Sequence, residues 1–113
     1  MTTLYVVDEL VARPGDAQAL LQDYLERYAP GARARGMALD RVLVSPPLWL
    51  ANGSNTLTIT WSLTGVAQWW QMRALAGADA AVAAWWVEVD ERVVSRRRHF
   101  MAAHEDLEAP IDV

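Results

Sequence analysis

The residues of this sequence that could do chemistry are concentrated in one short stretch near its end, "VVSRRRHFMA". An extended chain there places Arg97 and His99 on one face, and Arg96 and Arg98 on the other. A histidine in an apolar cavity can act as general acid or base near neutral pH. An arginine can hold an enolate or a carboxylate. His99 is therefore a candidate catalytic residue, and Arg97 a candidate substrate-binding residue.

Both assignments have a structural alternative. His99 could be a structural histidine whose polar atoms are satisfied on an edge strand. Three consecutive arginines could form a charged edge that discourages sheets from aggregating. A metal site at His104, Glu105 and Glu108 is not expected, because two histidines five positions apart share a helix face poorly and no third strong ligand is suitably spaced. No phosphate loop, dinucleotide fingerprint or serine elbow is present, and we expect no bound cofactor.

Aromatic residues suggest where an organic ligand could bind, because six tryptophans accompany a single phenylalanine. Trp69–Trp70 and Trp85–Trp86 are adjacent pairs, and neighbouring helical positions lie about 100° apart. One member of each pair must therefore lie at the margin of the core, at a subunit contact or in a cavity wall. Core and interface packing is one explanation. The other is a pocket for which the candidate lining residues are Trp61, Trp70, Trp86 and Arg73, although Arg73 could merely stack on a tryptophan.

The composition indicates one folded domain. The chain has 113 residues, 53% of them hydrophobic, and a net charge of −4. A mildly acidic chain is not expected to bind nucleic acid or anionic membranes. The absence of cysteine excludes disulfides and thiolate catalysis. We find neither a signal peptide nor an apolar run of about 20 residues, so a cytoplasmic protein is expected.

Hydrophobic periodicity predicts the elements that must position these residues. Extended segments are expected at 3–12, 37–45, 56–63 and 94–101, and helices from 16 to about 30, from 65 to about 76 and from 79. Asp16 is the expected N-cap of the first helix, and Pro30-Gly31 should end or kink it. "NGSN" at 52–55 is a hairpin-type turn. In "TLTITWSL" one face carries the apolar side chains and the other the hydroxyl groups, with Thr58 and Thr60 among them.

The resulting order βαββαβ predicts an α+β ferredoxin-like fold with a four-stranded antiparallel sheet over residues 1–103, followed by an acidic C-terminal tail at 104–113. Two helices would cover one face of the sheet only. We expect the other face to carry Val6, Leu10, Val42 and Val44, depending on register. Apolar area of that kind is normally buried against a partner, which favours a homodimer.

Two stretches, "ARPGDAQALLQDYLERY" and "TLTITWSLTGVAQWW", resemble the dimeric α/β-barrel superfamily of antibiotic-biosynthesis monooxygenase-like and NIPSNAP-like proteins. The resemblance covers roughly residues 3–101. It implies two sheets meeting face to face, with a cavity between each sheet and its helices or the partner. It also places Asp8, the second candidate catalytic residue, on the sheet face away from the helices, with Thr58 and Thr60 on that or a neighbouring face as candidate substrate-binding residues. The Asn, Trp and His of the haem-degrading branch have no counterpart in the expected positions.

The sequence therefore predicts a small homodimer that binds an apolar or aromatic organic molecule in a tryptophan-lined pocket. As an enzyme it would work without a cofactor, as a monooxygenase-like protein, an isomerase or a cyclase, with His99 moving a proton. The resemblance puts monooxygenase-like activity first. The alternative is a non-catalytic ligand carrier or a protein-interaction module of the same fold.

Overall fold

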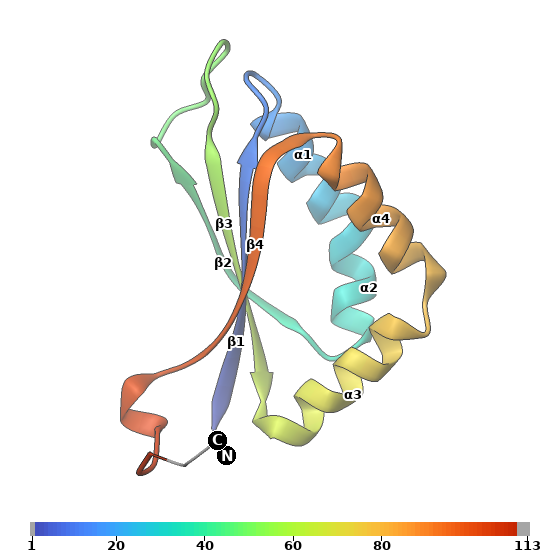
Figure 1. Cartoon of the computed structure of the whole chain (residues 1–113), viewed down its shortest axis with the longest axis vertical. Coiled ribbons are helices and arrows are strands. Elements are labelled where there is room, and N and C mark those ends of the chain that lie inside the picture. The colour runs from blue at the N-terminus through green and yellow to red at the C-terminus, as the bar shows by residue number, and fades with distance from the viewer. Residues whose placement is uncertain (1, 111–113) are drawn as a thin grey trace.

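Residues 2–110, the part described by the computed structural model, form a four-stranded antiparallel sheet with the α-helices packed on one of its faces (Figure 1). In chain order the elements are β1 (Thr3–Ala12), α1 (Ala17–Asp23), a π-helical turn (Tyr24–Tyr28), α2 (Ala29–Ala34), β2 (Ala38–Ser45), β3 (Thr56–Thr64), α3 (Gly65–Gly77), α4 (Ala80–Asp90), β4 (Val93–Ala102) and a 3₁₀ turn (His104–Asp106). The predicted α+β class and the order βαββαβ are confirmed.

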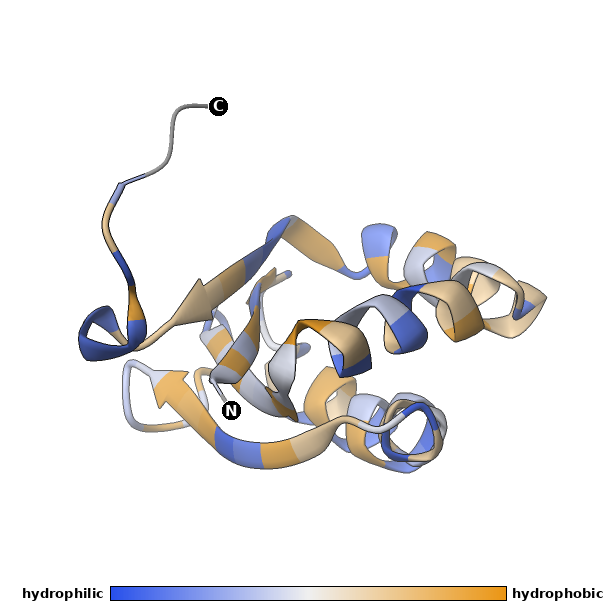
Figure 2. Ribbon diagram, turned by 90° about the horizontal axis from the view of Figure 1, so that it is seen from below, coloured by the Kyte–Doolittle hydropathy of each residue, from blue (hydrophilic) through white to orange (hydrophobic). Residues whose placement is uncertain are grey.

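The strands lie in the order β2-β3-β1-β4, so that β1 and β3 are central and β4 is an edge strand. Alternation along β1 and β3 explains the core, because every second side chain points to the helices. On β3 these are the four apolar residues expected from the sequence, Leu57, Ile59, Trp61 and Leu63, each at most 2% exposed. Figure 2 shows the same two layers from below.

The register of β1 corrects the expected faces of the sheet. Leu4, Val6, Asp8 and Leu10 are all buried, so they share the helix-covered face. The prediction that Asp8 faces away from the helices is therefore wrong, because strict alternation places it with the apolar residues. Thr58 and Thr60 pair with Glu9 and Val7 on the opposite face, and do not share a face with Asp8.

The apolar residues assigned to the helix-free face lie on the other face as well. Val6 and Leu10 are 2% and 1% exposed beneath the helices. Val42 and Val44 pair with Ile59 and Leu57, which places them on the helix-covered face too. The apolar residues that the helices leave uncovered are different ones, and include Leu43, which pairs with Thr58, and Met101, which pairs with Tyr5.

The first helical segment continues to Ala34 and does not end at Pro30-Gly31. Pro30 lies in the first turn of α2, where its missing N–H costs no hydrogen bond. Before it the chain widens into the π-helical turn, closed by the bond from Ala29 N–H to the carbonyl of Tyr24. The wide turn leaves both Tyr24 and Tyr28 buried against the sheet. Asp16 does not make the expected N-cap bond; its carboxylate accepts instead from Arg92 Nε at 3.3 Å.

A ten-residue connection joins β2 to β3, and Asn55 organises it. The Asn55 amide, 1% exposed, donates to the carbonyls of Pro46 and Leu48 and accepts from Leu50 N–H. The facing turn after β1 contains Gly15, at φ +78°, where a Cβ would lie 2.5 Å from the carbonyl oxygen of Ala51. Glycine is required there both by the backbone conformation and by this close approach.

The second helical segment is divided as predicted. Asp79 separates α3 from α4, and its carboxylate caps α4 by accepting from Ala81 N–H at 2.9 Å. The last strand begins one residue before the predicted segment and ends one residue after it. The predicted acidic tail extends beyond the described residues at 111–113, and it stays a prediction.

Candidate functional site

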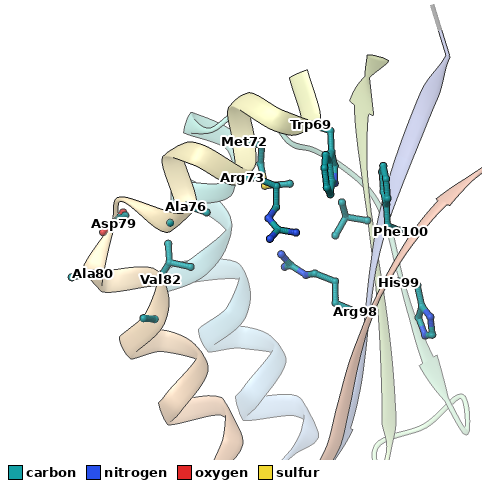
Figure 3. Close-up of a pocket in the computed structure, with 13 residues that line it drawn as sticks. Trp69, Met72, Arg73, Ala76, Asp79, Ala80, Val82, Arg98, His99 and Phe100 are labelled. Carbon is teal, nitrogen blue, oxygen red and sulfur yellow. The ribbon is translucent and has the colours of Figure 1, made fainter. Parts of the chain in front are cut away.

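A cavity of about 580 Å³ lies between α3, α4 and the helix-covered side of β4 and β1. Figure 3 shows it with side chains from all of these elements except β1 labelled. Its wall is mainly apolar, with a few charged groups. The lining residues are Val6, Trp69, Met72, Arg73, Ala76, Gly77, Asp79, Ala80, Val82, Ala83, Arg98, His99 and Phe100.

Aromatic rings form the wall where α3 meets the sheet. Trp69 of α3 stacks on Phe100 of β4, with ring centroids 4.5 Å apart and an interplanar angle of 15°. The guanidinium carbon of Arg73, one turn further along α3, lies 5.3 Å from the Trp69 ring. Trp69 and Arg73 come from α3 and Phe100 comes from the edge strand β4. The packing of α3 against β4 therefore forms this wall.

An ion pair between the buried Asp8 and the partly exposed Arg98 lies at the floor of the cavity. Arg98 donates from Nε to Asp8 Oδ1 at 2.6 Å and from Nη2 to Asp8 Oδ2 at 2.9 Å. Tyr24 donates its hydroxyl proton to Asp8 Oδ2 at 2.7 Å, and Trp61 Nε1 donates to the Tyr24 oxygen at 2.6 Å. The Tyr28 hydroxyl accepts from Arg98 Nη2 at 2.9 Å. Both oxygens of the buried Asp8 carboxylate therefore have donors, as burial of a charged group requires.

Burial and charge in this network shift two pKa values. Desolvation, followed by the negative charge of Asp8, raises the pKa of the Tyr24 hydroxyl well above its usual value of 10. Burial alone lowers the pKa of Arg98, but its hydrogen bonds and charge interaction with Asp8 outweigh this effect and raise it overall. Tyr24 therefore remains a neutral donor, and Arg98 a permanent cation.

We expect Tyr24 to make the folded state lose stability in alkali. The unfolded chain ionises this tyrosine from about pH 10, whereas the folded chain holds the proton to higher pH. The stabilisation is therefore complete below pH 10 and is lost as pH rises towards the folded-state pKa. Urea unfolding between pH 9 and 11 should show a smaller decline in Tyr24→Phe than in the unmodified protein. Equal declines in the two proteins would contradict this.

Similarity to known proteins is found in the fold and not in the sequence. No protein-family model matches the chain, and no curated protein matches it in sequence. A NIPSNAP family protein of unknown function from Agrobacterium tumefaciens matches 90% of this chain over 88% of its own length, with a TM-score of 0.69 and 12% identity. An uncharacterised NIPSNAP domain protein from Burkholderia xenovorans matches 94% of this chain over 99% of its own, with a TM-score of 0.67 and 12% identity.

A further NIPSNAP family protein from Agrobacterium tumefaciens has a TM-score of 0.68 and 15% identity, covering 94% of this chain and 90% of its own. The chain has the NIPSNAP fold. The resemblance read from the sequence is thereby confirmed for the architecture, and identities of 12–15% support nothing finer.

Within this NIPSNAP fold, the tryptophans divide between core and cavity differently from the prediction. Trp61 is fully buried beneath Tyr24 and does not line the cavity. Trp70 is 62% exposed, whereas its neighbour Trp69 forms the cavity wall. Trp86 packs beside Tyr28 and lies beneath Arg98, whose guanidinium carbon is 5.1 Å from the Trp86 ring. One member of each pair, Trp69 and Trp86, lies at the margin of the core. Of the two tryptophans expected in the pocket from these pairs, neither Trp70 nor Trp86 lines this cavity.

The remaining predicted site residues separate onto the two faces of the sheet. His99 borders the cavity, but Figure 3 shows its ring pointing away from Arg98 and Phe100. Its Nε2 lies 3.9 Å from the carboxylate of Glu9 on the helix-free face. Arg97, Thr58 and Thr60 share that face, as the strand register requires. The His99 imidazole therefore points away from the cavity that it borders, and both oxygens of Asp8 are hydrogen-bonded to Arg98.

Residues that the sequence reading missed complete the site, chiefly Trp69, Arg98 and Phe100. The alternation of side chains along a strand could have identified two of them. Arg98 and Phe100 are two positions apart on β4 and therefore point to the same face of the sheet. The same rule applied to Leu4, Val6 and Leu10 would have placed Asp8 inside. Nothing in the sequence identifies Trp69 over Trp70, because α3 is apolar around much of its circumference.

Arg35 is a second buried cation and lies outside this cavity. It is 8% exposed, and its Nε and Nη2 have no hydrogen-bond partner among the described residues. Its guanidinium carbon lies 5.6 Å from the Tyr28 ring, and this contact offsets part of the cost of burial.

Residues 2–110 contain neither a membrane-spanning helix nor a cluster of metal ligands. No helix in this part of the chain is long and apolar enough to cross a membrane. In the same range, no three His, Asp or Glu side chains come together in a group that could hold a metal ion.

Proposed function

We propose that this protein is a homodimeric binding module for a flat, apolar organic molecule, and that the ligand occupies the cavity between α3, α4 and β4. The observation that supports this most directly is the cavity itself. At about 580 Å³, with an apolar wall and a stacked Trp69–Phe100 pair, it has the size and lining of small-molecule sites. Its few charged groups are Arg98 at the floor, Arg73 on α3 and Asp79 at the start of α4, with His99 at the border.

The lining favours binding over acid–base catalysis. Of its ionisable side chains, Arg73 and Arg98 point into the cavity, whereas His99 points to the other face (Figure 3). The carboxylate of Asp79 accepts from Ala81 N–H as the cap of α4. Arginine stays protonated at physiological pH and moves no proton there. We therefore favour the ligand carrier over the monooxygenase-like, isomerase or cyclase activity expected from the sequence.

The helix-free face of the sheet supports the homodimer. All α-helices lie on the other side of the sheet (Figure 1), which leaves apolar side chains of the strands uncovered. Leu43 and Met101 on this face are 55% and 46% exposed. Exposed apolar side chains on an uncovered sheet face are normally buried by a partner. A second copy packing sheet to sheet would cover them and would bring the Glu9–His99 pair into the interface.

Native mass spectrometry of the purified protein tests both parts of the proposal. We expect a dimer that takes up one naphthyl compound per protomer when 2-naphthoate or 2-naphthamide is added. A monomer at micromolar concentration would contradict the dimer. Failure of both compounds to bind, in mass spectrometry and in calorimetry, would contradict the binding function.

Trp69→Ala should weaken binding of the tighter of these compounds by about tenfold, because the loss of an aromatic contact costs about 1.4 kcal/mol. Isothermal titration calorimetry measures the change. Trp49→Ala is the matched control, since Trp49 is 41% exposed in the connection between β2 and β3 and does not line the cavity. Equal weakening by both substitutions would show that the ligand binds elsewhere.

A further inference from the structure

We infer that the ligand of this cavity is an amphipathic organic acid: an apolar, ring-containing body with one carboxylate, which is bound between Arg73 and Arg98. The inference rests on the proposed binding function and goes further, because it names the chemical class of the ligand. Four features of the cavity support it: the fixed guanidinium of Arg98, the unpaired guanidinium of Arg73, the position of the nearby carboxylates, and the apolar remainder of the wall.

Arg98 presents a prepared hydrogen-bond donor. Asp8 holds its Nε and Nη2, and Tyr28 accepts a further bond from Nη2. These bonds fix the plane of the guanidinium and leave Nη1 without a hydrogen-bond partner among the described residues. The side chain is 34% exposed and lines the cavity. A donor held in this way loses little conformational entropy when it binds an anion.

Arg73 supplies a second guanidinium with no counter-charge. Among residues 2–110 it forms no ion pair, and its one identified polar interaction is with the Trp69 ring. Figure 3 shows the Arg73 and Arg98 guanidinium groups pointing into the cavity and toward one another. Two cations facing each other repel, and an anion between them removes this repulsion while accepting hydrogen bonds from both.

The nearby carboxylates limit the ligand to a single negative charge. The ion pair with Asp8 already neutralises the charge of Arg98, so that Arg73 supplies the uncompensated positive charge of the cavity. Asp79 lines the far part of the cavity, where its carboxylate accepts from Ala81 N–H and caps α4. Figure 3 places it well away from the two guanidinium groups. A second anionic group on the ligand would therefore meet Asp79 or an apolar wall.

The rest of the cavity requires an apolar ligand body. Val6, Met72, Val82 and Ala83 surround the space beyond the guanidinium groups, and Trp69 and Phe100 add their rings. These side chains cannot compensate the desolvation of a second polar group. An inorganic anion such as phosphate would leave this apolar volume unfilled, whereas an aromatic carboxylate fills both parts.

Calorimetry at pH 7 with two probes of nearly equal shape tests this inference. 2-Naphthoate is charged, and 2-naphthamide is its neutral analogue. We expect naphthoate to bind at least about tenfold more tightly to the unmodified protein, as one charge-assisted pair at a partly buried site provides. In Arg73→Gln the two affinities should come within about threefold of each other, chiefly because naphthoate binds more weakly.

Arg33→Gln is the matched control, because Arg33 is an exposed arginine of α2 that does not line the cavity. It removes the same charge from the protein and should keep the preference for naphthoate. If both probes bind equally well, or the preference survives Arg73→Gln, the assignment of an acid is overturned while the binding function stands. If neither probe binds, the binding function fails first and the inference fails with it.

Discussion

Replacing Arg98 by Met should lower the free energy of unfolding by about 3 kcal/mol. The substitution leaves the Asp8 carboxylate, whose side chain is 2% exposed, without its counter-charge. Only the Tyr24 hydroxyl would still donate to it. We place the effect at the lower end of the range for broken buried pairs, because 34% of the Arg98 side chain is exposed. Urea unfolding followed by circular dichroism measures it.

Arg96→Met provides the matched control for this experiment. Arg96 lies two residues earlier on β4, stacks on Trp86 at 4.8 Å and pairs with Asp90, which is exposed. It should cost much less stability than Arg98→Met. The double variant Asp8→Asn with Arg98→Met should regain part of the loss, because it removes the uncompensated charge. A double variant as unstable as Arg98→Met would show that packing, and not the ion pair, accounts for the effect.

Replacing Trp61 by Ala should lower the free energy of unfolding by about 3–5 kcal/mol, as expected for a large aromatic side chain removed from a core. Trp61 is 0% exposed and packs on Tyr24 and Tyr28, with ring centroids 6.3 Å and 6.4 Å away. The substitution also removes the hydrogen bond from Trp61 Nε1 to the Tyr24 hydroxyl. Denaturant unfolding followed by circular dichroism measures the loss.

Trp70→Ala is the control that separates core from surface tryptophans. Trp70 is 62% exposed and contacts Trp69 edge to face, so it should cost less than about 1 kcal/mol. Similar losses for Trp61→Ala and Trp70→Ala would contradict the division of the tryptophans between core and surface.

The two sets of variants distinguish stability from binding. Asp8, Arg98 and Trp61 belong to the network that holds β1, β4 and the π-helical turn together, and their substitution reports mainly on folding. Arg73 and Trp69 lie on α3 at the cavity wall, and their substitution should report mainly on the ligand. The bonds from Arg98 to Asp8 and Tyr28 order its side chain when the protein folds. The proposed ligand would therefore meet a rigid guanidinium at the floor of the cavity.

The order of elements and the two faces of β3 could be predicted from the sequence, because both depend on local periodicity. On β3 the apolar residues alternate with hydroxyl residues. Because successive side chains of a strand point to opposite faces, this pattern places all four apolar residues on one face: Leu57, Ile59, Trp61 and Leu63. The sequence also predicts the division of the second helical segment at Asp79, because capping involves only residues that are close together in the chain. These features alone were enough to predict a ferredoxin-like α+β fold.

The inward position of Asp8 depended on the tertiary structure. Its partner Arg98 is 90 positions away in the chain, and Tyr24 comes from a separate helical turn. The family resemblance suggested the open face for Asp8, whereas the alternation of Leu4, Val6 and Leu10 indicated the core. Alternation decided the outcome, because a buried carboxylate is tolerated once two distant donors satisfy it.

The choice between adjacent tryptophans, and the cavity itself, were also decided only by packing. Trp69 faces the cavity because α3 packs on β4 with Phe100 beneath it, and this rotation of the helix has no signature in a segment that is apolar on several sides. Spacing along the chain thus determined which residues share a strand face. The docking of helix on sheet determined which charged groups meet, because their partners are distant in sequence and are brought together only by the register of β1 with β4.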